Sequence, residues 1–195
     1  MRTLPVLALL FLSACVAPTG PVEVTRFHRT DTATLGHGSV AIEPAEGQDG
    51  DSLEFRSYAA AVSRELQRVG YSELVAGTRS SDSIAVVSVE RASFRRDSNG
   101  SPISVGVGGA TGSYGSGVGV GVGLNLSGPP PETVETRLSV TIRSRASGQS
   151  LWEGRASFSA RATSPLAQTQ LGAAKLAEAL FRGFPGTSGE TILVE

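Results

Sequence analysis

The sequence contains a single cysteine, Cys15, so no intrachain disulfide can hold the folded chain together. Cys15 follows Leu12-Ser13-Ala14 at the end of an apolar run, Leu4 to Phe11, with one basic residue, Arg2, in front of it. A basic residue, a short apolar run and small residues before the cut are typical of a secretory signal. Removing residues 1–14 from the 195-residue chain leaves 181 residues. That is the size of one domain, which must be stabilised by its own hydrophobic core.

The segment Leu12-Ser13-Ala14-Cys15 resembles the lipobox of bacterial lipoproteins, in which the signal peptidase cuts before the cysteine. The resemblance implies a diacylated thioether at Cys15, the lipid attachment residue, and two acyl chains anchor a protein stably. In the enteric sorting scheme an acidic residue after the cysteine retains a lipoprotein in the inner membrane. Val16 stands there instead, which favours the outer membrane, with the domain on the periplasmic face. A plain cleaved signal and a buried N-terminal helix are the alternatives.

Charge and hydropathy exclude several classes of protein. The chain has 17 basic and 18 acidic residues and no clustered basic run, so no nucleic-acid partner is expected. No later apolar run approaches the roughly 20 residues of a membrane helix. We therefore expect a signal peptide over residues 1–14, a lipid anchor and tether over 15–21, and one domain over 22–195 with a Gly-rich insert at 98–131.

Two segments have the periodicity of amphipathic helices. The first is expected to begin with a capping box, Asp51-Ser52-Leu53-Glu54, and to end at Gly70. Its apolar stripe has spacings of three and four residues and comprises Phe55, Tyr58, Ala59, Val62, Leu66 and Val69. The second is expected to begin at Ser164-Pro165 and to end at Gly183. Its buried stripe comprises Leu166, Ala173, Leu176, Ala177, Leu180 and Phe181.

The remaining apolar segments are typical of β-strands. Strands are expected at 22–28, 40–42, 84–89, 138–142, 152–161 and 192–194. The 84–89 run is nearly all apolar, which predicts a strand covered on both faces, and Ser147-Gly148 predicts a two-residue hairpin turn. Together these elements predict an α+β, two-layer domain with a mostly antiparallel sheet and two helices on one face. Arg137, Thr141 and Arg155 are expected on the solvent face.

The insert has an unusual composition. No charged residue occurs from Ser98 to Pro131, and residues 104–128 hold ten of the chain's 24 glycines. Apolar residues alternate with glycine or serine on both sides of an expected turn at 108–117, which predicts a hairpin over 103–126. Three alternatives remain for this hairpin: it is disordered or loosely paired, it pairs with another protein by strand addition, or it enters the membrane or closes an oligomeric barrel. The candidate contact residues are Val105, Val107, Val118, Val120 and Val122.

Several of these segments together resemble the domain-of-unknown-function 4136 family of Gram-negative envelope lipoproteins. The residues that carry the resemblance are Leu66-Gln67-Arg68-Val69-Gly70-Tyr71, the strand at 84–89, the Gly-rich insert and Leu151-Trp152-Glu153-Gly154-Arg155-Ala156. The last is similar to a family signature strand, Leu-Val-Trp-Arg-Gly. The resemblance covers most of residues 22–185 and implies a periplasm-facing lipoprotein with no assigned chemistry.

No motif for catalysis, cofactor or metal binding is found. The Gly-rich stretch Gly106 to Gly112 is not followed by a helical pattern, as a phosphate loop requires. His28 and His37 lie nine residues apart with no thiol to complete a zinc site, and the only lysine, Lys175, lies within the second expected helix. The acidic residues Asp31, Asp49, Asp51 and Asp82 lack the spacing of a calcium loop. Trp152 alternates with solvent-facing residues and is expected in the core.

We therefore expect a non-enzymatic outer-membrane lipoprotein with a structural or partner-binding role in the cell envelope. Neither a cofactor nor a metal is expected, and the partners are the membrane, through Cys15, and an envelope protein or a second copy. One alternative is a subunit of a transport or secretion assembly that oligomerises through the hairpin at 103–126. An envelope hydrolase is kept as the third hypothesis, because the sequence does not place the carboxylates in space.

Overall fold

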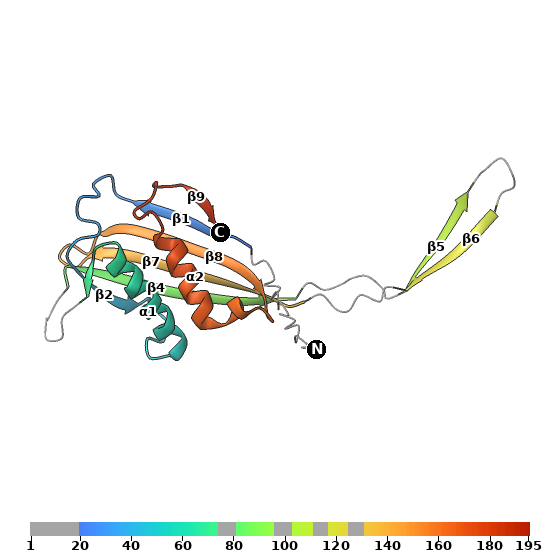
Figure 1. Ribbon diagram of the computed structural model, residues 1–195, viewed down its shortest axis with the longest axis horizontal. Coiled ribbons are helices and arrows are strands. Elements are labelled where there is room, and N and C mark those ends of the chain that lie inside the picture. The colour runs from blue at the N-terminus through green and yellow to red at the C-terminus, as the bar shows by residue number, and fades with distance from the viewer. Residues whose placement is uncertain (1–19, 74–80, 96–102, 111–116, 125–130) are drawn as a thin grey trace, which may run out of the picture.

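The computed structural model describes residues 20–73, 81–95, 103–110, 117–124 and 131–195 (Figure 1). Its strands are β1 (Val22–His28), β2 (Ser39–Pro44), β3 (Ser72–Glu73), β4 (Ser83–Phe94), β5 (Ile103–Ala110), β6 (Gly117–Leu124), β7 (Thr133–Ser144), β8 (Ser150–Arg161) and β9 (Thr191–Val194). Its helices are α1 (Leu53–Arg68), the 3₁₀ turn η1 (Pro165–Ala167) and α2 (Thr169–Phe181). Among these residues no helix is long and apolar enough to cross a membrane.

Seven strands form one open sheet in the order β3-β2-β4-β7-β8-β1-β9. All pairs are antiparallel except those of β2, which runs parallel to β3 and β4. Both helices cover the same face of this sheet, so the α+β, two-layer prediction is confirmed (Figure 1). The strands β1 and β9 also confirm the strands expected near the two ends of the domain.

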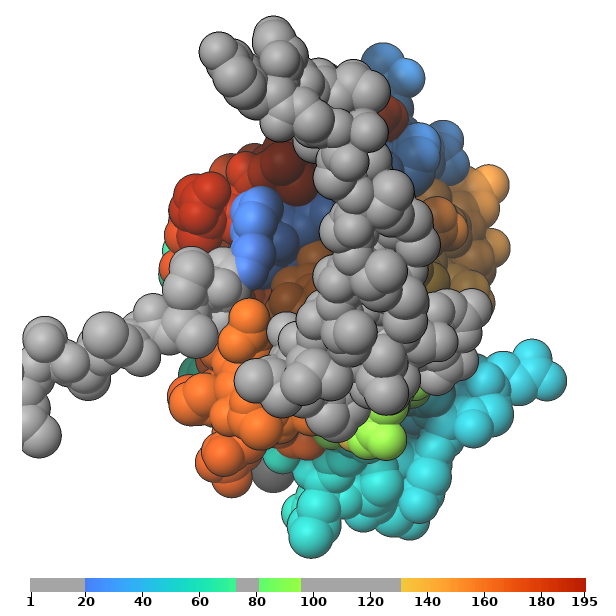
Figure 2. All heavy atoms as spheres, turned by 90° about the vertical axis from the view of Figure 1, so that its right-hand side faces the viewer, coloured from blue at the N-terminus to red at the C-terminus, as the bar shows by residue number. Residues whose placement is uncertain are grey.

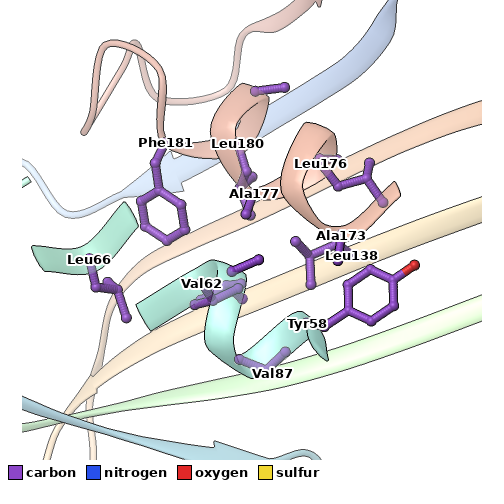
Figure 3. Packing of buried hydrophobic residues seen from close by; sticks show 14 of the residues in the cluster. Tyr58, Val62, Leu66, Val87, Leu138, Ala173, Leu176, Ala177, Leu180 and Phe181 are labelled. Atoms are coloured by element: carbon purple, nitrogen blue, oxygen red, sulfur yellow. The ribbon is translucent and has the colours of Figure 1, made fainter. Parts of the chain in front are cut away.

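The core lies between the helices and the covered face of the sheet. Val62 and Leu66 of α1 point toward α2 and the sheet, and Phe181 of α2 lies beside them (Figure 3). In the sheet, Val87, Leu138 and Trp152 are fully buried, as the alternation along their strands predicts. Tyr58 and Tyr71 are also buried, which confirms their role in packing the helix layer on the sheet.

The opposite face of the sheet carries no helix in the described part of the chain. In β4, Ala85 and Val87 are fully buried, whereas Ile84 and Val86 are half-buried. The prediction that this strand is covered on both faces is therefore wrong: its second set of apolar side chains lies on the open face. Arg137 and Arg155 are exposed on that face, as expected.

Helix α1 begins one residue later than the capping box predicts. Ser52, not Asp51, is the N-cap, and its hydroxyl accepts a hydrogen bond of 3.1 Å from the Phe55 amide. The Asp51 amide instead donates to the Asp49 carboxylate in a turn before the helix. At the other end, the amide of Gly70 donates to Gln67 and that of Tyr71 donates to Leu66, the bonds of a Schellman motif. Gly70 has a φ of 109°, so the expected glycine stop is confirmed.

Two other boundaries differ from the predictions. Ser164-Pro165 starts η1 rather than the α-helix, and α2 follows from Thr169 with Gln168 as its N-cap residue. The β7–β8 connection is the five-residue loop 145–149, closed by a bond from the Gly148 amide to the Ser144 carbonyl, rather than a two-residue turn. Ser164-Pro165 and Ser147-Gly148 thus both lie in turns, as predicted, but each connection is longer than the dipeptide alone indicates.

The segments β5 and β6 form a second, two-stranded antiparallel sheet, drawn apart from the seven-stranded sheet in Figure 1. The strands include residues 108–110 and Gly117, so the expected turn at 108–117 is too long. The end of the expected hairpin, residues 125–126, lies outside the described residues.

Candidate functional site

The expected lipid attachment residue, Cys15, lies outside the described residues, which begin at Gly20. The seven-stranded sheet includes Val22, the first residue of β1. Val22 is fully buried and pairs with Val194 of β9. Six residues, 16–21, therefore separate the start of the sheet from Cys15, the position at which a lipid is expected.

The two histidines lie in different surroundings. In His28, Nδ1 lies 2.8 Å from the Arg29 carbonyl oxygen and Nε2 lies 3.1 Å from that of Gly186. Whichever ring nitrogen carries the proton has a carbonyl to donate to, and donation from Nε2 links β1 to the C-terminal loop. His37 lines a separate polar cleft. No cluster of three His, Cys, Asp or Glu side chains with metal-binding geometry occurs among the described residues.

The polar cleft, of about 540 Å³, lies where the loop after β1 meets the β7–β8 loop and the start of β4. Its charged and polar lining includes Arg29, Asp31, His37, Asp82 and Gln149. These groups are largely paired with protein: Arg29 donates to the Gln149 side-chain oxygen at 2.5 Å. Asp82 Oδ2 accepts from the Ser39 amide at 2.8 Å and from the Ser39 hydroxyl at 2.7 Å.

The hydrogen bonds from Ser39 lower the pKa of Asp82 below its ordinary value, because they stabilise the carboxylate. A carboxylate with a lowered pKa is a weak base, so Asp82 is poorly suited to remove the proton of the Ser39 hydroxyl that donates to it. Asp82 therefore serves to join β2 to the start of β4, and the described lining of the cleft has no recognisable catalytic arrangement. Asp49 is likewise used in the turn before α1, and Lys175 lies in α2, as expected.

A second hollow, of about 640 Å³, is an apolar groove between α1 and β2. It is lined by Val40, Ala41, Ile42, Ala59, Ala60, Ser63, Arg64, Leu66 and Gln67. Beside it, β3 pairs with β2 only at Ser39 and Val40, so the rest of β2 has no described strand on this side. The groove is open, and its polar side chains, Ser63, Arg64 and Gln67, all come from α1, whereas β2 contributes only apolar residues.

The buried polar residue that sequence reasoning missed is Arg26 of β1, which is 5% exposed. Its Nε donates to the Leu180 carbonyl at 2.9 Å, and one terminal nitrogen donates to the carbonyls of Ala179 at 3.0 Å and Arg182 at 2.8 Å. Burial lowers the pKa of Arg26, and Glu190 partly offsets this. Arg26 thus satisfies the orphan carbonyls of α2, where a positive charge also complements the helix dipole.

This role had a signal in the sequence. Val22, Val24 and Arg26 share one parity on β1, and the first two are core residues. An arginine in a core position must find acceptors, and the last turn of a helix supplies unpaired carbonyls. Arg26 is therefore a structural residue that joins β1 to α2.

The hairpin contains the expected contact residues. Its register pairs Val105 with Val122 and Val107 with Val120, with Gly106–Gly121 between them and Gly108–Gly119 next to them. Val118, the fifth candidate, faces Gly109. The structure thus brings four of the five candidates together as two facing pairs.

The molecule is a two-layer α+β protein with a projecting Gly/Val hairpin and no recognisable catalytic centre in its described part. The chain belongs to the DUF4136 family, a domain of unknown function, whose profile matches residues 26–186. This finding confirms the resemblance seen in the sequence. An uncharacterized protein from Zymomonas mobilis, ZMO1243, is 30% identical over an alignment that covers 96% of this chain and 86% of the relative.

Solved structures with some likeness share very little sequence. A PDZ domain protein from Parabacteroides distasonis matches with a TM-score of 0.47 and 10% identity over 90% of this chain and 39% of that longer chain. The PelC dodecamer from Paraburkholderia phytofirmans matches with a TM-score of 0.42 and 9% identity, covering 81% of this chain and 93% of the other. Scores at this level carry no argument about the function of this chain.

Proposed function

We propose that this protein is a lipid-anchored, non-enzymatic component of the outer membrane whose periplasmic domain binds a partner in the cell envelope. The observation that carries the proposal is the position of Cys15, the only cysteine, directly after Leu12-Ser13-Ala14 and a short apolar run. Val16 in the next position supports the outer membrane as the destination.

The fold supports the second half of the proposal. The buried polar group Arg26 is used by the fold itself, and Asp82 is tied to Ser39. In the described part of the chain, β5 and β6 pair only with each other, so this hairpin adds no hydrogen bond to the seven-stranded sheet. A strand pair with two open edges is suited to pairing with other strands, which is a binding role rather than a catalytic one.

Intact-mass measurement of the mature protein tests the anchor. We expect a chain that starts at Cys15 and carries the mass of a diacylglyceryl group, and Cys15→Ser should prevent both the modification and the lipoprotein-type cut. Membrane fractionation tests the destination: the wild-type protein should sediment with the outer membrane. Val16→Asp should move it toward the inner membrane, and Val16→Thr is the matched control. An unmodified Cys15, or a cut elsewhere, contradicts the anchor.

A further inference from the structure

The outer edge of β2 has backbone groups that the described part of the chain does not use. The Gly38 carbonyl accepts a hydrogen bond from the Ser72 amide of β3, so Gly38 directs its backbone groups away from β4. Successive residues of a strand point their backbone groups to opposite sides, so Val40 and Ile42 do the same. Since β3 pairs with β2 only at Ser39 and Val40, the N–H and C=O of Ile42 face no described strand.

The groove beside this edge is apolar and has a basic flank. Ala59 and Ala60 of α1 leave room above Ile42, and Arg64 also lines the groove. Arg56 lies on the same flank of α1, two turns or about 12 Å from Arg64. Both acidic residues of α1 are ion-paired, whereas Arg56 and Arg64 have no ion-pair partner among the described residues. The groove therefore suits an extended apolar segment that carries acidic groups.

The opposite edge of the same sheet carries such a segment. The strand β9, Thr191–Val194, contains no charged residue, but Glu190 precedes it and Glu195 follows it, about 16 Å apart along an extended chain. In the described part of the chain β9 pairs only with β1. Figure 1 shows β9 at one edge of the sheet and β2, with the short β3, at the other. In Figure 2 the cyan residues that follow β2 and the dark red residues of the C-terminal part lie on opposite sides of the molecule.

The strands β2 and β9 match in direction and in face. β2 is parallel to β4, and four antiparallel pairs lead from β4 through β7, β8 and β1 to β9, so β9 is parallel to β2. Ile42 and Ile192 each lie two positions from a buried core residue, Val40 and Val194 respectively. Alternate residues share a face, so both isoleucines lie on the face that the helices cover.

The backbone groups of β9 also face the right way. The Arg29 amide donates to the Leu151 carbonyl of β8, so the odd-numbered residues of β1 point to β8 and the even-numbered residues point to β9. Val24 therefore exchanges hydrogen bonds with Ile192, its partner in the register. The N–H and C=O groups of the neighbouring residues Thr191 and Leu193 are then left on the open edge.

We propose that β9 of one copy adds to β2 of a second copy as a parallel strand, with Ile192 beside Ile42 in the apolar groove. In this register the Ile42 amide donates to the Thr191 carbonyl, and the Leu193 amide donates to the Ile42 carbonyl, as a parallel ladder requires. The contact joins two different surfaces, so it can repeat from copy to copy and build a ring or an open chain. This inference goes beyond the proposed function and does not need the lipid anchor.

The charges agree with the same register. α1 runs back along β2 and leads to β3, which pairs with the start of β2, so Arg64 lies nearer that start than Arg56 does. In a parallel strand Glu190 also lies nearer the start of β2. Glu190 of one copy then lies on the side of Arg64, and Glu195 lies on the side of Arg56.

Sedimentation velocity of the full chain, purified in detergent at up to about 100 µM, tests this inference, because a small interface gives weak association. We expect the wild-type protein to form species larger than a monomer. Leu193→Pro removes an amide that faces the open edge and should raise the dissociation constant about tenfold or more, whereas Leu193→Ala keeps that amide and is the control. Arg64→Glu should weaken association as much, and Arg155→Glu on the open face of the sheet is its control.

A mixture of the two variants tests whether the contact joins unlike surfaces. Leu193→Pro keeps the groove and Arg64→Glu keeps β9, so together they should form a heterodimer that adds no third copy. Circular dichroism checks that each variant is folded. If Leu193→Pro does not fold, Glu190→Arg takes its place, and Arg64→Glu in the same chain should then restore association.

A wild-type protein that stays monomeric overturns the inference, as do variants that associate like the wild type. It is also overturned if Leu193→Pro abolishes association while Arg64→Glu leaves it unchanged, because β9 would then pair with β9 of the second copy. A mixture that stays monomeric contradicts the pairing of unlike surfaces. An unmodified Cys15 would refute the anchor and would leave each of these outcomes unaffected.

Discussion

Gly154 of β8 explains the spacing of the signature Leu151-Trp152-Glu153-Gly154-Arg155. Trp152 and Gly154 lie on the same face of the strand, and the indole ring lies over the glycine. A Cβ at position 154 would lie 2.2 Å from the Trp152 Cη2 atom and 2.8 Å from Leu180 Cδ1. The backbone φ of Gly154 is not in the left-handed region, so the reason for glycine here is space rather than backbone conformation. Gly154→Ala should therefore overpack the core.

The size of the effect depends on whether the indole can move. Its Nε1 donates to the Pro185 carbonyl at 3.0 Å, and the ring stacks on Phe181 with centroids 5.3 Å apart. Phe184 packs on it at the same centroid distance. Overpacking of such a site destabilises a protein by about 1–3 kcal/mol or somewhat more. Replacing a glycine within a strand stabilises it by about 0.5–1 kcal/mol, which offsets part of that loss. We expect Gly154→Ala to lower the free energy of unfolding by about 2 kcal/mol.

Urea unfolding of the domain from Val22, followed by circular dichroism, measures this change. A double-mutant cycle gives the sharper result, because Trp152→Phe removes the ring atoms that the new Cβ would meet. In that background Gly154→Ala should cost at least 1 kcal/mol less than in the wild-type chain, by the same overpacking argument. Equal costs in both backgrounds, or no cost in the wild-type chain, would refute the steric reasoning.

Three further predictions follow from buried side chains. Trp152→Ala and Leu66→Ala should each lower the free energy of unfolding by about 2–5 kcal/mol in urea titrations, because both side chains are fully buried. Arg137→Ala, on the open face, should change it by well under 1 kcal/mol. Equal effects of Trp152→Ala and Arg137→Ala would mean that the faces of the sheet are assigned wrongly. Arg26→Met should cost about 2–4 kcal/mol because the carbonyls at the end of α2 lose their donors, and an unchanged urea midpoint would contradict that role. Burial raises the pKa of Tyr58 from its ordinary value of 10.0 to about 12, so the folded state keeps the phenol proton at a pH where the unfolded state has lost it. The contribution of Tyr58 to the free energy of unfolding is therefore complete below pH 10 and is lost as the pH rises toward 12. Tyr58→Phe should flatten the loss of stability over that range, measured by urea titration at several pH values.

Periodicity was enough to predict the layers of this fold. The stripe of α1 and the alternation along β7 and β8 each define one buried face, and burial of those faces against one another leaves a two-layer domain. Boundaries were harder, because Asp51 and Ser52 are adjacent residues that can both cap a helix. Only the entry direction of the chain, fixed by the turn at Asp49, decides between them.

Features that depend on distant partners could not be predicted from local pattern. The run at 84–89 is apolar on both faces, yet only the tertiary arrangement shows that helices cover one of them. The acceptors of Arg26 lie more than 150 positions away in the sequence. The Val/Gly alternation did predict a hairpin, but the residue pairs of its ladder and its separation from the seven-stranded sheet come only from the structure.

The position of β1 in the sheet has a mechanical consequence. A pull on residues 15–21 is transmitted along β1, which pairs with β8 on one side and β9 on the other. The antiparallel hydrogen bonds run across the strands, so both ladders resist the load in shear and share it between them. Without β9, which comes from the last residues of the chain, β1 would be an edge strand held by a single ladder. The C-terminus thus reinforces the strand that would take the load from a membrane anchor.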